Sequence, residues 1–270
     1  MLDQRDLGRK ASDSDWLDAA IRFGFVGYGV VHLLIAWLAI QLAFGHERHQ
    51  ASPQGALKEL AGKPLGGVLV WAVAIGMFCL VAWRLLEAAL GHRDAEDSER
   101  WRLRAVSLGK AVVYGAIGTS AVRTALGGGG SSDQKDRSVT AKVMDWPAGT
   151  WLVGCIGLVI VGVGLAHIRK GLSDEHRDSL SSEGKRGESG SAYLLLGKVG
   201  YVAKGLVIAG VGVLFGYAAI SHDPNRSGGL DTALRTVLEQ PYGPALLCAL
   251  ALGLGCFGLF CLARARHLST

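Results

Sequence analysis

Apolar residues form six long stretches along the chain, and shorter polar segments separate them. The stretches cover residues 23–44, 65–83, 105–122, 148–168, 193–220 and 242–263. A bilayer core about 30 Å thick needs roughly 20 mostly apolar residues in a helix that rises 1.5 Å per residue. The pattern therefore predicts an all-α, polytopic membrane protein with six transmembrane helices.

Two of the six stretches carry basic residues, whereas the other four contain no Asp, Glu, Lys or Arg. In the third stretch the uncharged part lies between Lys110 and Arg123, and the fifth carries Lys198 and Lys204 near its start. Long basic side chains keep their apolar stems in the membrane while the charged end extends toward an interface. We therefore expect both stretches to span the membrane.

The six stretches form three similar pairs. Basic residues open the odd-numbered stretches at matching positions, namely Arg22, Arg104 and Lys198. A Pro-x-Gly sequence precedes or opens each even-numbered stretch, at residues 64–66, 147–149 and 241–243. Proline suits the first turn of a helix, where its fixed φ fits and its missing N–H would be unpaired anyway. Because each pair crosses twice, successive pairs begin on the same side of the membrane. The chain is thus predicted to hold three parallel two-helix repeats with pseudo-threefold symmetry about an axis along the membrane normal.

The repeats divide the chain into five segments. The expected boundaries are a cytoplasmic N-terminal tail at 1–19, repeat 1 at 20–92, repeat 2 at 102–170, a cytoplasmic linker at 171–192 and repeat 3 at 193–265. Within each repeat a loop joins the two helices. We expect short amphipathic helices at 54–60 and 231–239 in the first and third loops, and a flexible glycine and serine tract at 127–132 in the second.

The distribution of basic residues predicts the orientation. The N-terminal tail, the segments between repeats, the C-terminal tail and the adjoining helix ends hold 16 Lys and Arg residues, against 9 in the three loops within repeats. Because Lys and Arg are retained on the cytoplasmic side, both termini are predicted to be cytoplasmic in a bacterial plasma membrane. The chain has a net charge of +5, and its basic residues lie at the ends of apolar stretches. This distribution therefore suits anionic lipid headgroups rather than nucleic acid.

Several of these segments resemble a known family. They are Gly-Tyr-Val-Ala-Lys-Gly-Leu-Val at 200–207, the related 24–31, the three Pro-x-Gly sequences and Ala-Trp-Arg-Leu-Leu-Glu-Ala at 82–88. Over nearly its whole length the chain resembles a bacterial integral-membrane family catalogued as domain of unknown function 1206. Phe25 and Tyr28 depart from the Gly-Tyr-x-x-basic-Gly opening of its repeat. The resemblance implies a six-span membrane protein, and it brings no activity or site residues.

Known catalytic and metal-binding patterns are absent from the sequence. The five cysteines all lie in apolar stretches without a Cys-x-x-Cys pair, so a disulfide framework or a zinc site is not indicated. His46 and His49 form a short His-x-x-His motif, which an exposed polar loop explains better than a metal site. There is no phosphate-binding Gly-Lys-Ser/Thr loop and no nucleophile elbow. We expect no enzymatic activity, no cofactor and no metal.

The abundant glycines favour close helix packing. Small residues recur at intervals of four, a spacing that lets helix backbones approach each other in lipid. The faces expected to pack in this way are Ala111–Gly115–Thr119, Gly212–Gly216 and Ala249–Gly253.

Polar residues inside the spans give the one candidate site. Lys110 and Lys204 occupy the same repeat position, which Tyr28 fills in repeat 1, and His32 and Tyr114 match each other one turn further on. If the odd-numbered helices surround the repeat axis, these five residues form a basic and aromatic cluster that holds a lipid phosphate or passes a small anion. The alternative is that both lysines, about six residues from the expected helix ends, extend separately to the interface.

Arg84 and Glu87 are three residues apart and are expected to form a structural ion pair rather than a proton relay. Taken together, the residues predict a non-enzymatic scaffold or accessory protein that binds lipid or a membrane partner. A second copy of the chain is among the expected partners. A small-solute or anion channel or transporter along the repeat axis is the alternative, and a continuous polar path through His32, Lys110 and Lys204 would distinguish it.

Overall fold

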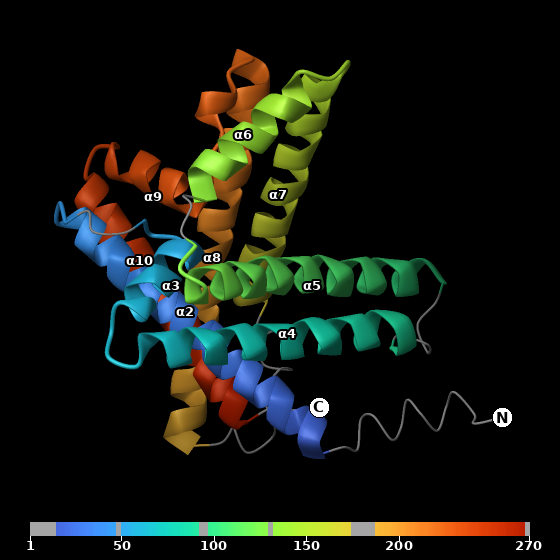
Figure 1. The fold of residues 1–270 in the computed structure, drawn as a ribbon, viewed down its shortest axis with the longest axis vertical. Helices are drawn as coiled ribbons and strands as arrows, with labels where there is room; N and C mark the ends of the chain where they lie inside the picture. Colours follow the sequence, from blue (N-terminus) through green and yellow to red (C-terminus); the bar gives the residue numbers. More distant parts are fainter. Residues whose placement is uncertain (1–14, 47–49, 92–96, 129–131, 174–186, 268–270) are drawn as a thin grey trace.

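The computed structural model describes residues 15–46, 50–91, 97–128, 132–173 and 187–267, and in these ranges it is helical without strands. Six long helices form the body of the protein (Figure 1): α2 (Asp15–Ala43), α4 (Gly66–Leu90), α5 (Asp97–Ala125), α7 (Gly149–Leu172), α8 (Gly187–Ser221) and α10 (Gly243–Arg266). Shorter elements lie between them: α3 (Pro53–Ala61), α6 (Ser132–Met144), η2 (Pro224–Arg226) and α9 (Leu230–Leu238).

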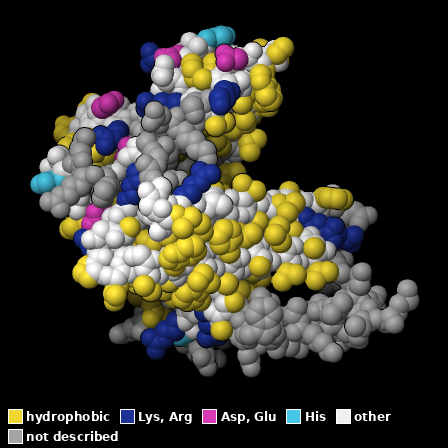
Figure 2. All heavy atoms as spheres, in the orientation of Figure 1, with side chains coloured by type: hydrophobic (Ala, Val, Ile, Leu, Met, Phe, Trp, Pro, Cys, Tyr) yellow, Lys and Arg dark blue, Asp and Glu magenta, His cyan; other side chains and the backbone are white. Residues whose placement is uncertain are grey.

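Each of the six long helices is long and apolar enough to cross a membrane. This includes α5 and α8, which contain the two stretches with basic residues, so the predicted set of six spans is confirmed. Large apolar side chains remain exposed on the outer faces of the helices, among them Val68, Val112, Trp151 and Leu158. Figure 2 shows such side chains spread over α4, α5 and α7. An apolar outer surface is what a membrane protein presents to lipid.

The Pro-x-Gly sequences form the same turn in all three repeats. The residue between proline and glycine adopts a left-handed conformation, with φ of 61° at Leu65, 64° at Ala148 and 61° at Tyr242. A Cβ atom on the glycine that follows would overlap a backbone carbonyl oxygen just before the turn, such as that of Val143 for Gly149 and of Leu238 for Gly243. Only glycine fits such a close approach, which explains why the sequence recurs.

The three repeats pack in a cyclic order. The second helix of each repeat lies against the first helix of the next, giving the pairs α4–α5, α7–α8 and α10–α2. The last pair joins repeat 3 to repeat 1, as a pseudo-threefold arrangement requires. Within repeats, α2 packs on α4 and α8 packs on α10, whereas α5 and α7 of repeat 2 form no comparable packing. The three pairs run in different directions, with α4 and α5 side by side across the view and α7 and α8 along it, and α5 and α7 diverge (Figure 1).

Glycines bring α7 and α8 together most closely. Gly157 and Gly164 on α7 face Gly205 and Gly212 on α8, and a Cβ atom on any of the four would come within 2.6–2.8 Å of the partner helix's backbone. The expected packing role of Gly212 is therefore found. Gly216 belongs to the same contact, because a Cβ atom on Gly157 would also lie 2.8 Å from the Gly216 backbone nitrogen.

The loops within repeats interlock at one end of the bundle, which we call the loop end. The buried carboxylate of Asp231 accepts a hydrogen bond from the Ala51 backbone N–H at 2.7 Å and pairs with Arg235 at 2.8 Å. The Nε atom of Arg137 donates to the Ser227 carbonyl at 3.3 Å. Short helices occur in the first and third loops as predicted. The second loop, expected to begin with a flexible tract at 127–132, also holds a helix, α6, and residues 129–131 lie outside the described ranges.

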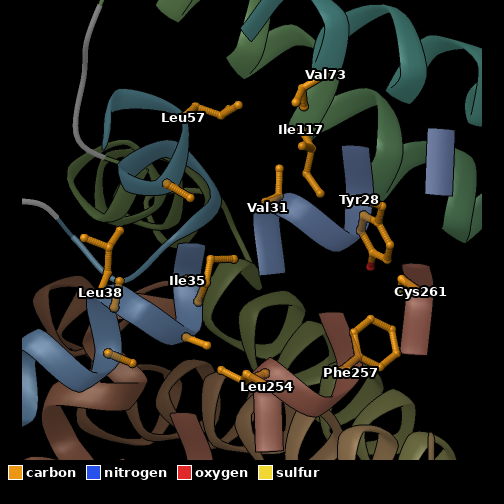
Figure 3. Close-up of a cluster of buried hydrophobic side chains, with 14 of the residues drawn as sticks. Tyr28, Val31, Ile35, Leu38, Leu57, Val73, Ile117, Leu254, Phe257 and Cys261 are labelled. Atoms are coloured by element: carbon orange, nitrogen blue, oxygen red, sulfur yellow. The ribbon is translucent and has the colours of Figure 1, made fainter. Parts of the chain in front are cut away.

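Apolar side chains fill the centre of the bundle. Along α2, Val31, Ile35 and Leu38 are buried, and they lie among Leu57, Val73, Ile117 and Leu254 from four other helices (Figure 3). This apolar core lies between the loop end and Tyr28. The opposite end of the bundle, where α2 begins and α10 ends, is called the termini end below.

Candidate functional site

Tyr28 lies at the centre of a group of aromatic rings contributed by three helices. It is buried in α2, and its ring centroid is 4.3 Å from His32, 5.1 Å from Tyr114 on α5 and 6.1 Å from Phe257 on α10. The Tyr28–Tyr114 and Tyr28–Phe257 pairs meet edge to face, the geometry in which the positive ring edge approaches the negative ring face. The helices from three repeats thus meet at one tyrosine.

Lys204 on α8 points into this group. Its Nζ atom donates a hydrogen bond to the Tyr28 hydroxyl at 2.6 Å and lies 3.9 Å from the centroid of the Phe257 ring. The negative face of an aromatic ring attracts such a cation, more strongly where water is excluded. Lys204 is therefore directed toward the bundle interior rather than along its helix to the termini end.

His32 is held within the same group by its own helix. Its Nδ1 atom lies 2.9 Å from the Tyr28 carbonyl oxygen, to which it donates one turn earlier in α2. Its ring centroid is 4.9 Å from that of Phe257. The side chain is buried and held by this hydrogen bond and the ring contact.

The second helices of the repeats, α4, α7 and α10, contribute polar residues at matching positions. Twenty residues after each Pro of the Pro-x-Gly turns stand Arg84, His167 and Cys261. Three residues further on stand Glu87, Lys170 and Arg264. The alignment of the repeats covered only their first helices, and it missed His167, Lys170 and Arg264 as site residues. Counting from the prolines would have found them.

Arg84 and Glu87 form the expected ion pair, and both have further contacts. Arg84 is buried, with its guanidinium 3.9 Å from the Trp83 ring centroid. Glu87 also accepts a hydrogen bond from the Ser107 hydroxyl on α5 at 2.8 Å. The Nε atom of Arg84 is buried without a hydrogen-bond partner among the described residues. A buried, partly unsatisfied arginine is costly unless another group completes its contacts.

The remaining basic residues surround the aromatic group on the termini side. The Lys170 Nζ atom is 5.2 Å from the Tyr201 ring centroid, and the Arg264 guanidinium is 4.3 Å from that of Phe25. Tyr201 in turn packs edge to face on Phe257 at 5.2 Å. Lys110 is close enough to Arg84, Lys170 and Arg264 for their charges to act on it. We call Arg84, Lys110, Lys170, Lys204 and Arg264 the basic cluster.

Four of the five predicted site residues come together: Tyr28, His32, Tyr114 and Lys204. The charges that act on Lys110 come from Arg84 and Glu87 on α4, Lys170 on α7 and Arg264 on α10. Its side chain forms no hydrogen bond or ion pair with the described residues. The two lysines were expected about six residues from the helix ends, and this is wrong. Because α5 begins at Asp97 and α8 at Gly187, Lys110 and Lys204 follow the helix starts by 13 and 17 residues.

Negative charge is scarce near the basic cluster. Among the described residues, the carboxylate whose charge acts on Lys110 is that of Glu87. Arg84 and Ser107 already donate hydrogen bonds to it. No group of three or more His, Cys, Asp or Glu side chains suited to a metal occurs in the described ranges. His49 of the His-x-x-His motif lies outside them. The arrangement therefore combines excess positive charge with aromatic faces and hydroxyl groups, a combination that can bind an anion.

Comparisons with known proteins give a family and a relative. The sequence profile of the Domain of Unknown Function (DUF1206) matches three times, at residues 23–91, 105–174 and 199–267. An uncharacterized protein of Bacillus subtilis, YxxB, is 28% identical over 258 residues, which cover 94% of this chain and 92% of the relative. No solved structure matches. The three matches coincide with the three two-helix repeats of the structure.

Proposed function

The chain belongs to the DUF1206 family, whose description names no function, and we propose from its site that it binds a phosphate-bearing anion. The basic cluster would hold this ligand, and the protein would act as a non-enzymatic scaffold or accessory component. The observation that carries the proposal is the inward position of Lys204, bonded to Tyr28 and placed over Phe257.

Electrostatics supports this function. The charges of Arg84, Lys170 and Arg264 act on Lys110, and that of Lys170 also acts on Lys204. The neighbouring carboxylate, Glu87, is already engaged. Like charges repel, and the repulsion is strong where apolar walls exclude water. A bound anion would reduce it. Arginine and lysine form charge-assisted hydrogen bonds with phosphate oxygens, which makes phosphate the best-matched chemical group.

Conduction of small ions along the repeat axis is the second candidate that the sequence raises. It requires a polar path from the basic cluster to the loop end. The buried side chains that follow Tyr28 along α2 toward that end, Val31, Ile35 and Leu38, are apolar and closely packed. This packing favours binding over conduction.

The proposed function is tested by replacing Lys204 with Met, which keeps an apolar stem of similar length without the charge. The protein is reconstituted in vesicles of phosphatidylcholine and phosphatidylglycerol, released, and analysed by native mass spectrometry for retained phosphatidylglycerol. Lys198→Met is the matched control, because Lys198 is exposed six residues earlier on the same helix. We expect Lys204→Met to retain several-fold less anionic lipid, while Lys198→Met behaves like the parent. Equal retention by folded Lys204→Met protein would contradict the proposal.

A flux assay separates binding from conduction. Vesicles containing the protein and loaded with chloride or nitrate should release the anion no faster than protein-free vesicles. Flux that depends on protein and falls in Lys204→Met would instead support the channel.

A further inference from the structure

Repeat 2 lacks a helix contact that the other two repeats have. The two helices of repeat 1, α2 and α4, pack on each other, as do α8 and α10 of repeat 3, whereas α5 and α7 do not. In Figure 1 these two helices diverge, and the space-filling view shows an open angle between them (Figure 2). We call the region between α5 and α7 the open seam.

Residues at matching repeat positions show which faces are uncovered. On the first helices, Val31 and Val207 are 0% and 4% exposed, whereas the equivalent Val113 of repeat 2 is 50% exposed. On the second helices, Leu80 and Phe257 are 0% and 4% exposed, and the equivalent Val163 is 44% exposed. The helix faces that cover each other in repeats 1 and 3 are therefore both left open in repeat 2.

The sequence explains why the seam does not close. The first helices of repeats 1 and 3 carry glycine at the contact, Gly24 and Gly200. A Cβ atom there would lie 2.5 Å from Leu80 Cγ or 2.6 Å from Phe257 Cα. The equivalent residue of repeat 2 is Val106.

On the facing helix, too, valine stands in repeat 2 where the other repeats have glycine. Gly76 of repeat 1 and Gly253 of repeat 3 correspond to Val159 of repeat 2. Gly76 lies directly against Gly24, and Gly253 against Ala203. Two β-branched side chains in place of two glycines keep the helix backbones apart, because such crossings depend on small residues. The open seam is thus encoded in the sequence.

The helix faces along the open seam are apolar, and basic residues lie at one end of it. On α7, the exposed side chains of Leu152, Ile156, Val159 and Val163 recur at helical spacing, and the same face continues to Lys170 near the end of the helix. On α5, Val106 and Val113 stand on either side of Lys110. The charges of Lys110 and Lys170 act on each other across the seam.

We propose that one anionic phospholipid occupies the open seam, with an acyl chain along the valine-lined faces of α5 and α7 and its phosphate between Lys110 and Lys170. The inference rests on the proposed binding of a phosphate-bearing anion and assigns that anion's class and position. Free phosphate would leave the apolar faces uncovered. A partner helix would need acidic residues at the level of the two lysines, whereas anionic lipid headgroups bind in basic sites between transmembrane helices.

Two double variants test the proposal. Val106→Gly with Val159→Gly recreates the glycine pair of the closed repeats, so that α5 and α7 can approach and exclude the lipid. Lys110→Met with Lys170→Met removes the charges and leaves the apolar seam intact. Val112→Gly with Leu158→Gly is the matched control, because these residues are exposed on the outer faces of the same helices. Val106→Ala with Val159→Ala provides a milder seam variant if the glycine pair fails to fold.

The readout is phosphatidylglycerol retained in native mass spectrometry after reconstitution in vesicles of phosphatidylcholine and phosphatidylglycerol. We expect the parent and the outer-face control to retain one phosphatidylglycerol, and each seam variant to need at least tenfold more of this lipid for the same occupancy. Retention by both seam variants together with loss in Lys204→Met would overturn the seam assignment and leave the proposed function standing. Retention in all three would overturn both. A parent dimer without bound lipid, converted to monomer by the Val106→Gly and Val159→Gly pair, would show that a second copy covers the seam.

Discussion

At the scale of single residues, the contact between Lys204 and Tyr28 determines how the candidate site is organised. A lysine inside a transmembrane helix either extends to an interface or finds partners in the bundle. Lys204 has both a hydrogen bond to Tyr28 and the face of Phe257. These contacts keep a positive charge at the centre of the molecule, where three helices from different repeats meet.

Replacing Tyr28 with Phe removes only the hydroxyl group that accepts from Lys204. A hydrogen bond to a charged group contributes roughly 1.5–3 kcal/mol, so the free energy of unfolding should fall by about 2 kcal/mol. Denaturant unfolding in detergent micelles, followed by tryptophan fluorescence, measures the change. Tyr242→Phe is the control, because that hydroxyl is exposed at the loop end. Equal stability of Tyr28→Phe and the parent would mean that Lys204 finds another partner.

The sequence predicts part of the candidate site for a definite reason. Tyr28, Lys204, His32 and Tyr114 lie on the first helices of the repeats, α2, α5 and α8, whose basic openings align them directly. Phe257 and Arg264 lie on α10, the second helix of repeat 3, and their position depends on counting from Pro241 rather than on local pattern. Which aromatic ring lies against the Lys204 ammonium group depends on how the helices cross, and hydrophobic periodicity does not determine the crossing.

At the scale of helices, close packing depends on glycines spaced seven apart on α7 and α8. Gly157 and Gly164 meet Gly205 and Gly212 at backbone distance. In lipid, helices gain little from burying apolar side chains against each other, so such close contacts provide most of the attraction. The α7–α8 pair links repeats 2 and 3 and holds Lys170 and Lys204 on the same side of the bundle.

Gly164→Ala tests this packing. The added Cβ atom would lie 2.6–2.8 Å from atoms of Gly205 and Ala209, and overpacking of this kind typically costs 1–3 kcal/mol, so the unfolding midpoint should fall. Gly162→Ala is the matched control on the same helix, since no atom lies within 4 Å of its Cβ position. Alanine should there be neutral or stabilise by up to about 1 kcal/mol through helix propensity. Similar midpoints for both variants would show that α7 and α8 tolerate a wider separation.

Element-level prediction from sequence succeeds for the spans and fails for details of packing. The spans follow from composition, and α3 and α9 follow from their amphipathic patterns. The helix α6 was missed because the glycine tract before it dominated the interpretation of that loop, although the repeat implies a helix there. Small-residue spacing identified Gly212 and Gly216, but it missed Gly157, Gly164 and Gly205, because spacing alone does not show which face of a helix meets a neighbour.

At the scale of the whole molecule, three similar units form a bundle that is closed at two repeats and open at the third. The cyclic pairs α4–α5, α7–α8 and α10–α2 give the repeats equivalent places. The buried Asp231 and the contact of Arg137 with Ser227 tie the loops together at the loop end. The sequence predicts this equivalence from matching turns, whereas the open seam depends on valines that replace glycines in one repeat.

The orientation of the molecule in the membrane gives the last prediction. Basic residues number 16 on the side of the termini and 9 in the loops within repeats, which predicts cytoplasmic termini because translocation of Lys and Arg is disfavoured. Single cysteines at Arg102 and Glu239, both exposed, would be introduced into a cysteine-free background. A membrane-impermeant thiol reagent should label Glu239→Cys in intact cells and Arg102→Cys only after permeabilisation. The reverse pattern would place the termini outside and the basic cluster at the outer half of the membrane. The candidate ligand would then be a headgroup of the outer leaflet, since Lys110 and Lys170 lie toward the termini end.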